Sequence, residues 1–281
     1  MSIIRDLPEA DYHRDTEHLS ASGAKVLLGK RPPSEDSDAI QFGRLVHTVI
    51  LEPEKLDRYA VLNADVIGVK KDGSKATNPK NTDAWREAVF KAERDGLIVI
   101  DGRTLAKAQA LADAVANHPE AGRLLAAATE HEVSMFADNL TGAPVRGRLD
   151  LLGPDFVADV KTCRDADPAE FGRVIEKLMY HVSAANYLDI ARANGINARE
   201  FLFICVETEP TLSGEYRVSV IELHRDAIDL GRDLMAQACE RWLANGRRID
   251  LPHYGNGRHV VDLPPWAYDN DFEDIQIGGA A

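Results

Sequence analysis

Apolar residues in the first part of the chain recur at a helical spacing. The segment HLSASGAKVLLGK predicts a helix with Ser20 or Ser22 as its N-cap, ending before Pro32-Pro33. A second helix is predicted from residue 38 to Pro53, which ends it, and its expected apolar face comprises Ile40, Leu45, Val46, Val49 and Ile50. Two further helices are predicted over about 81–94 and 104–117, with the short strand LIVI between them. A mainly helical part over about 15–128 is therefore expected.

From Glu130 onward the pattern changes from helical spacing to alternation. The segments HEVSMFAD, APVRGRLDLLG and DFVADVKT predict three successive strands with turn residues between them. Helices over about 168–179 and 181–194 follow, then the strands REFLFICVE and EYRVSVIEL and a helix over about 225–245. This order predicts an α/β fold with a mixed central β-sheet flanked by helices. We expect one domain over 1–261, with its sheet over about 130–223, and an acidic C-terminal tail over 262–281.

Composition narrows the class of protein. The chain has 281 residues, of which 44% are hydrophobic and 28% charged, as is ordinary for globular proteins. No apolar run approaches the roughly 18 residues of a membrane helix, and the acidic N-terminus does not resemble a signal peptide. We therefore expect a cytoplasmic protein without a membrane partner. Its three cysteines are far apart, which argues against disulfides, zinc and an iron–sulfur cluster.

Net charge bears on nucleic-acid binding. The net charge of −13 argues against tight, non-specific coating of DNA. It does not exclude an enzyme that acts on DNA, because a site built from carboxylates is itself acidic and divalent metals reverse its local charge. The polar stretch from Lys70 to Lys80 is predicted to be a loop, either solvated or acting as a flap that touches phosphates.

The stretch GRLDLLGPDFVADVKT places charged residues among apolar ones. Asp159 and Lys161 are two residues apart, so they project to the same face of a strand. The turn at Gly153-Pro154 allows the preceding strand to pair antiparallel, which brings Asp150 opposite Asp159. Two adjacent carboxylates repel each other unless a cation lies between them. The pattern is consistent either with a metal site or with a salt bridge on a half-exposed hairpin.

Oxygen ligands at such a site favour Mg²⁺, with Mn²⁺ as an alternative. The main-chain carbonyl of Val160 is a candidate further ligand. Lys161 would lie beside an attacking water, where it could orient the water, accept its proton or offset charge on phosphorus. Flanking carboxylates favour its charged form, which favours water positioning and charge stabilisation.

These motifs resemble a known family. GRLD followed by VADVKT resembles the core of PD-(D/E)xK nucleases, and three further segments resemble the exodeoxyribonuclease VIII (RecE-type) branch, which is related to phage lambda exonuclease. These segments are YHRDTEHLSASGAKVLL, FGRLVHTVILEP and YHVSAANYLDIAR. The resemblance implies that Asp150 and Asp159 bind the metal, that Lys161 is the catalytic lysine and that His47 is a further metal ligand. Without the motif, His47 would be expected to face solvent or to pack at the edge of the core.

The resemblance also assigns residues around this centre. Glu132 matches a family glutamate, which implies a carboxylate behind the ligands or in contact with substrate; an ordinary edge-strand Glu is the alternative. Tyr180 and Tyr187 match a helix motif of the branch, although core packing also explains them. Ser183 stands where that helix usually carries Gln, which puts substrate positioning in doubt.

Two arginines beside the predicted metal site and one position of the family motif also bear on the resemblance. Arg146 and Arg148 are candidates for phosphate contacts or for cross-strand pairs with carboxylates. Leu149 replaces the name-giving Pro of the motif, which is a frequent variation.

The function that the resemblance implies is a Mg²⁺-dependent exonuclease that degrades linear double-stranded DNA from the 5′ end. Its product would be a 3′ single strand for recombination, taken up by a RecT-like annealing protein. Relatives imply a ring-like homo-oligomer, a trimer or tetramer. One alternative is a Cas4-like or AddB-like nuclease of other polarity or an endonuclease, although such branches usually carry a four-cysteine cluster. Another is a catalytically impaired module that binds DNA ends.

Overall fold

The computed structural model describes residues 1–30, 37–70, 72–74, 76–140, 142–250 and 255–263. The chain divides into two units, Met1–Leu251 and Pro252–Ala281, and all helices and strands below belong to the first. In the second unit, the described residues 255–263 are exposed and form no helix or strand. The predicted helix stop at Pro32-Pro33, two lysines of the polar loop (Lys71 and Lys75) and residues 264–281 of the predicted tail lie outside the described residues.

The elements of the first unit follow one another in an order close to the predicted one. In chain order they are β1 (Ser2–Ile4), α1 (Glu9–Arg14), β2 (Leu19–Ser20), α2 (Ala21–Leu27), α3 (Asp38–Leu51), the 3-10 helix η1 (Pro53–Arg58), β3 (Tyr59–Leu62), α4 (Ala64–Ile67), the 3-10 helix η2 (Pro79–Asn81), α5 (Asp83–Arg94), β4 (Ile98–Asp101), α6 (Gly102–Asn117), α7 (Pro119–Ala127), β5 (Glu130–Leu140), β6 (Ala143–Leu152), β7 (Phe156–Cys163), α8 (Pro168–Lys177), α9 (Tyr180–Ala193), β8 (Glu200–Glu207), β9 (Val218–Glu222) and α10 (Arg225–Ala244).

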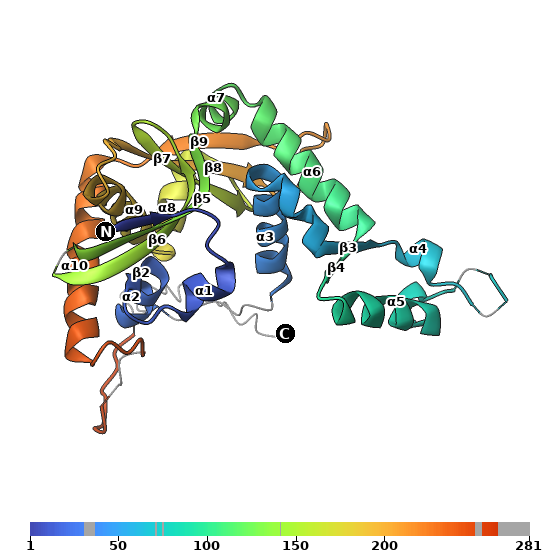
Figure 1. Cartoon of the computed structure of the whole chain (residues 1–281), viewed down its shortest axis with the longest axis horizontal. Helices are drawn as coiled ribbons and strands as arrows, with labels where there is room; N and C mark the ends of the chain where they lie inside the picture. Colours follow the sequence, from blue (N-terminus) through green and yellow to red (C-terminus); the bar gives the residue numbers. More distant parts are fainter. Residues whose placement is uncertain (31–36, 71, 75, 141, 251–254, 264–281) are drawn as a thin grey trace, which may run out of the picture. The chain divides into compact units, whose positions relative to one another are not determined.

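A mixed sheet organises these elements (Figure 1). Its strand order is β1-β5-β6-β7-β8-β9, and β2 pairs with β6 outside this path. Strands β5, β6 and β7 are successively antiparallel, β7 and β8 are parallel, and β9 is antiparallel to β8. The predicted α/β fold with a mixed central sheet is confirmed. A second, two-stranded parallel sheet joins β3 to β4, beside α3 and α6.

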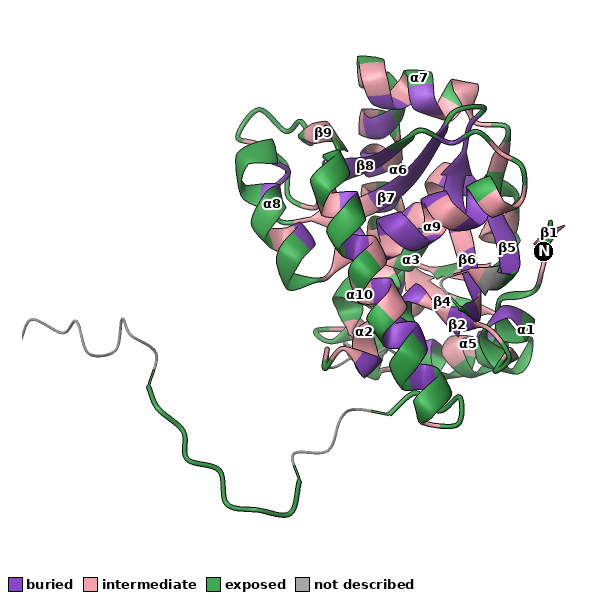
Figure 2. Ribbon diagram, turned by 90° about the vertical axis from the view of Figure 1, so that its left-hand side faces the viewer, coloured by how far each residue is buried: buried purple, intermediate pink, exposed green. Residues whose placement is uncertain are grey.

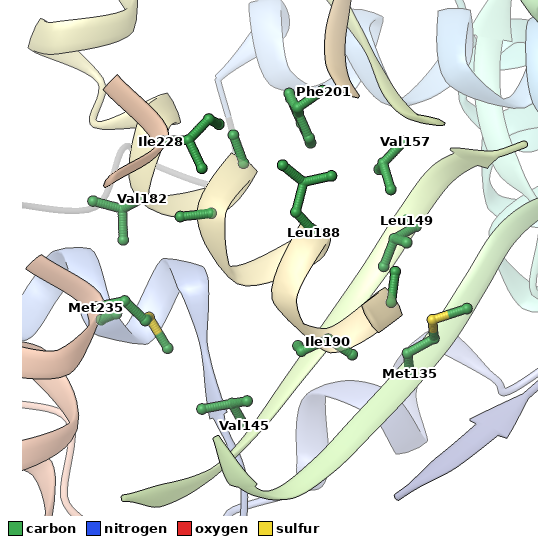
Figure 3. Packing of buried hydrophobic residues seen from close by; sticks show 14 of the residues in the cluster. Met135, Val145, Leu149, Val157, Val182, Leu188, Ile190, Phe201, Ile228 and Met235 are labelled. Atoms are coloured by element: carbon green, nitrogen blue, oxygen red, sulfur yellow. The ribbon is translucent and has the colours of Figure 1, made fainter. Parts of the chain in front are cut away.

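Helices cover both faces of the main sheet. Helices α2, α8, α9 and α10 pack on one face, and α3, α6 and α7 on the other. Along β7 the side chains alternate between the two cores, with Val157 in the first and Ala158 and Val160 in the second. Figure 3 shows Leu188 of α9 against Leu149 and Val157 of the sheet. Figure 2 shows buried residues on α9 and on the central strands, whereas the outer sides of α8 and α10 are exposed.

Local sequence signals explain where the main helices begin and end. The Ser20 side chain accepts a hydrogen bond from the main-chain N–H of Gly23, which confirms it as the N-cap of α2. Helix α3 ends at Leu51, two residues before the predicted stop at Pro53, which instead opens η1. Of the predicted apolar face of α3, Leu45 and Val46 are fully buried and the others only half-buried.

The alternation of apolar residues did not predict the shortest elements. Strand β2 has two residues, and β3 forms a sheet only through its partner β4. Helix α7 was missed because Pro119 begins it directly after α6, with His118 as its N-cap. Within the described residues no helix is long and apolar enough to cross a membrane.

The close contact between α9 and α10 gives a test of the fold. A Cβ atom at Gly231 of α10 would lie 2.2 Å from the carbonyl oxygen of His181 on α9. Replacing Gly231 with Ala should therefore lower the free energy of unfolding by about 1–3 kcal/mol, although Ala is the better helix former. Urea denaturation followed by circular dichroism measures this change.

The matched control is Gly172→Ala on α8, where an added Cβ would have no neighbour within 4 Å. This substitution should raise the stability by up to about 1 kcal/mol. Equal stability of the two variants would show that α9 and α10 do not approach each other as described.

Candidate metal centre

The β6–β7 hairpin brings the two aspartates together. The main-chain N–H of Gly153 donates to the carbonyl of Phe156 at 2.9 Å, and Leu151 pairs with Ala158 across the antiparallel strands. The pairing of β6 with β7 ends at these two residues, and the side chain of Asp150 accepts a hydrogen bond from the main-chain N–H of Val160 at 2.8 Å. A carboxylate thus takes the place of the next main-chain acceptor where the strands separate.

His47 approaches this point from α3. Its Nε2 lies 2.8 Å from the carbonyl oxygen of Val160. Its Nδ1 lies 3.5 Å from Asp150 Oδ2 and 3.8 Å from Glu132 Oε1. Because Leu45 and Val46 anchor α3 in the core, the helix holds the imidazole in this position.

Glu132 completes a possible metal-binding group. One ligand atom from each of His47, Glu132 and Asp150 lies within 4.8 Å of the others. Glu132 has a φ of +46°, a left-handed conformation that costs a non-glycine residue about 1–3 kcal/mol. The structure therefore places Glu132 beside the predicted metal ligands. The family resemblance had implied a position behind these ligands or in contact with the substrate.

Asp159 and Lys161 form a second pair next to this group. Their side chains make an ion pair, and Asp159 is not among the three grouped ligands. Lys161 Nζ lies 5.1 Å from the ring centroid of Tyr180, and the Lys25 ammonium lies at the same distance. Lys25 was missed because nothing in its spacing on α2 marks it as close to the β7 strand.

The charges of the centre are strongly coupled. Burial, together with the neighbouring carboxylate of Asp159, raises the pKa of Asp150 to about 7. Burial by itself would lower the pKa of His47, but Asp150 and Glu132 outweigh it and raise that pKa to about 9. Burial also disfavours the charged form of Lys161, but Asp159 and Asp150 raise its pKa above the ordinary value. Two cationic side chains therefore offset the buried carboxylates.

The donor set fits a hard or borderline divalent ion. Carboxylate and carbonyl oxygens suit Mg²⁺ and Mn²⁺, and a neutral imidazole is an acceptable further ligand. His47, Glu132 and Asp150 would hold the ion, with the Val160 carbonyl and the Asp159 carboxylate adjacent. A divalent ion would also replace the charge that the His47 imidazolium now supplies.

The two predicted phosphate-contacting arginines have a different arrangement. Both guanidinium groups pack on the ring of Tyr12, at 4.9 Å for Arg146 and 4.7 Å for Arg148. Arg146 is buried and contacts Asp15, while Arg148 donates to the carbonyl oxygen of Leu7 at 2.7 Å. Both arginines therefore hold the N-terminal segment, and these partners are not carboxylates of the paired strands.

The α9 residues named from sequence lie in different surroundings. Tyr180 packs over Lys161, while Ser183 is half-buried on the same helix. Tyr187 packs against Gly147, where a Cβ atom would lie 2.8 Å from the ring. Tyr187 also lines the cavity described next, so it combines a packing contact with access to the site.

The candidate ligands open into a cavity of about 610 Å³. One wall belongs to the N-terminal segment and contains Asp6, Glu9 and Tyr12. Another wall belongs to α3 and η1 and contains Arg44 and Arg58. Arg148 also lines this cavity.

Comparison with known proteins identifies the family and the fold of the chain. Residues 16–256 match the family described as "PDDEXK-like domain of unknown function (DUF3799)", and the chain belongs to this family. The predicted PD-(D/E)xK type of core is thereby confirmed, while its RecE-type branch stays a prediction. A search of curated proteins found no match.

Two solved structures resemble the chain. A "putative exonuclease" from Eubacterium rectale is 14% identical with a TM-score of 0.58, and the match covers 95% of this chain and 99% of the other. A phage-related exonuclease from Haemophilus somnus is 16% identical with a TM-score of 0.32, covering 67% and 97%. The likeness to the first of these structures shows a shared fold.

Proton competition gives a test of the centre. Metal ligation requires an ionised Asp150 and a neutral His47, whose pKa values are raised to about 7 and about 9. The affinity for Mn²⁺ should therefore rise with pH from about 6 to about 8.5, by about tenfold per unit above pH 7 and more steeply below it. Calorimetric titration measures this dependence.

The variant His47→Asn separates the two protonation events. It removes the imidazole, so its weaker Mn²⁺ affinity should become nearly independent of pH once Asp150 is ionised. An affinity that does not change with pH in the unmodified protein would argue against ligation by these two residues.

Proposed function

We propose that this protein is a divalent-metal-dependent deoxyribonuclease that hydrolyses phosphodiester bonds. The observation that carries the proposal is the grouping of His47, Glu132 and Asp150 next to the Asp159–Lys161 pair, at a cavity in a PDDEXK-like chain. Carboxylates and a protonated lysine around a divalent-ion site are suited to phosphodiester hydrolysis.

Each residue of the site would have its own role in hydrolysis. When bound, Mg²⁺ or Mn²⁺ supplies positive charge that polarises the phosphate and lowers the pKa of water. His47, Glu132 and Asp150 hold the ion, and the N–H of Val160 fixes the orientation of the Asp150 carboxylate. Asp159 and Asp150 raise the pKa of Lys161 and so favour its charged form. Its ammonium would orient the attacking water and offset charge on the phosphate.

The finer activity we propose is exonucleolytic. The RecE-type motifs support an enzyme that acts at ends of linear double-stranded DNA, and the similar structure from Eubacterium rectale is also named an exonuclease. By the same resemblance, digestion would run from the 5′ end and leave a 3′ single strand for recombination. A RecT-like annealing protein and a ring-like homo-oligomer belong to this proposal.

Hydrolysis of end-labelled DNA tests the proposal. Linear duplex labelled at the 5′ or the 3′ end is incubated with Mg²⁺, with a circular duplex as the control substrate. Lys161→Met and Asp150→Asn should each lower kcat by about 100-fold or more, since each removes charge or orientation that the transition state needs. Lys91→Met on the exposed side of α5 is the matched control and should retain full activity.

The outcomes separate the parts of the proposal. Wild-type rates in Lys161→Met would contradict the assignment of the site. Equal digestion of circular and linear DNA would reject the exonuclease and leave an endonuclease. A lack of hydrolysis with both Mg²⁺ and Mn²⁺ would reject the nuclease altogether.

A further inference from the structure

Two cavities adjoin each other beside the candidate metal centre. The first contains His47, Glu132 and Asp150, and the second, of about 700 Å³, is lined by residues of α3, β4 and the start of α6. Both are lined by Arg44, Tyr59 and Ile98. Figure 1 shows β3 and β4 next to α3 and α6, and the Tyr59 hydroxyl lies 3.3 Å from Thr48 Oγ1 of α3. A polymer that leaves the metal centre along α3 would therefore enter the second cavity.

Unpaired cations follow this route. Arg58 lines the first cavity, Lys80 the second and Arg44 both, and all three side chains are exposed. None of them forms an ion pair with any residue in the part of the chain that the structure describes. Nearby Lys55, by contrast, is paired with Glu52. In a chain with a net charge of −13, cations without acidic partners along one route favour an anionic ligand.

Aromatic and apolar side chains accompany these cations. Tyr59 and Ile98 lie at the junction, where Ile98 is 54% exposed, and Phe42 and Ile100 line the second cavity. Cations that contact phosphates beside aromatic surfaces that contact bases are the combination that binds single-stranded nucleic acid. Asp38 and Asp101 also line the second cavity; the Asp101 side chain caps α6 by accepting from the N–H of Arg103.

We propose that the two cavities form one track for single-stranded DNA, with phosphates on Arg44 and Arg58 and bases against Tyr59 and Ile98. This inference rests on the proposed function, whose substrate it specifies as a strand unpaired next to the scissile bond. The N-terminal segment that also lines the first cavity contributes Asp6 and Glu9. A second strand on that side would bring its phosphates against carboxylates, which favours one strand over a duplex.

Binding measurements test the track without hydrolysis. The full chain with Lys161→Met is titrated, in Ca²⁺ instead of Mg²⁺, against a fluorescein-labelled oligothymidylate of about 12 nucleotides, a length typical of single-strand sites. Adding Arg44→Gln should weaken binding at least about fivefold and reduce the slope of log affinity against log salt by about 0.7. Adding Ile98→Ser or Tyr59→Leu should weaken binding at least about fivefold with little change in that slope.

The matched control is Arg103→Gln, which removes an exposed guanidinium that is paired with Asp65 and lines neither cavity. It should bind within about twofold of the Lys161→Met background. The exposed position of Ile98 keeps the test valid if Tyr59→Leu does not fold.

Three results would overturn the track. Arg44→Gln and Ile98→Ser could bind like the Arg103→Gln control, or a duplex of equal length could bind as tightly as the single strand. The single strand could also bind with its affinity unchanged by Arg44→Gln alone. Hydrolysis of linear duplex by the unmodified protein is measured separately. If the unmodified protein hydrolyses DNA but the track variants do not change the binding of the single strand, only the track is rejected. If the unmodified protein does not hydrolyse DNA, the nuclease is rejected, whatever the binding results.

Discussion

The hydrogen bond from the main-chain N–H of Val160 to the Asp150 carboxylate is the interaction on which the candidate centre depends. The Val160 side chain is fully buried in one of the two cores, so its main chain cannot shift without disturbing the packing under α3 and α6. Its N–H fixes Asp150, its carbonyl meets His47, and its chain neighbours are Asp159 and Lys161. Core packing thereby determines the positions of the reactive side chains.

Burial of several carboxylates at one place imposes a requirement for positive charge. Without a metal, the His47 imidazolium and the Lys161 ammonium meet it, which explains why both have raised pKa values. Glu132 has a strained backbone and lies beside His47 and Asp150. Residues held in sparsely populated conformations are a feature of functional sites. A divalent ion would satisfy the carboxylates and release the lysine from Asp159.

The sequence predicted the parts of the site that depend on local periodicity. Alternation placed Asp159 and Lys161 on one face of a strand, and the turn at Gly153 brought Asp150 beside that strand, where it accepts from the Val160 N–H. The salt bridge offered as the alternative to a metal site is also present, between Lys161 and Asp159, although both aspartates are buried rather than half-exposed. His47 could be connected to this hairpin only through the family motif, because α3 is distant in sequence.

Other features depend on tertiary contacts that no local pattern encodes. The left-handed φ of Glu132 lies within β5, where neither the alternation nor the residue type predicts it. The packing of Arg146 and Arg148 on Tyr12 joins the sheet to the N-terminal segment, which alternation along β6 cannot reveal. Arg44 can be recognised as a cation that lines a cavity only when β3 and β4 are placed beside α3.

Anomalous diffraction from crystals grown with Mn²⁺ tests the central claim most directly, because it locates the ion independently of activity. The account predicts one strong peak within about 2.5 Å of an Asp150 carboxylate oxygen and of a nitrogen of His47, with Glu132 or the Val160 carbonyl in the coordination sphere. A fully occupied ion elsewhere, or none at this place when Mn²⁺ is saturating, would contradict it.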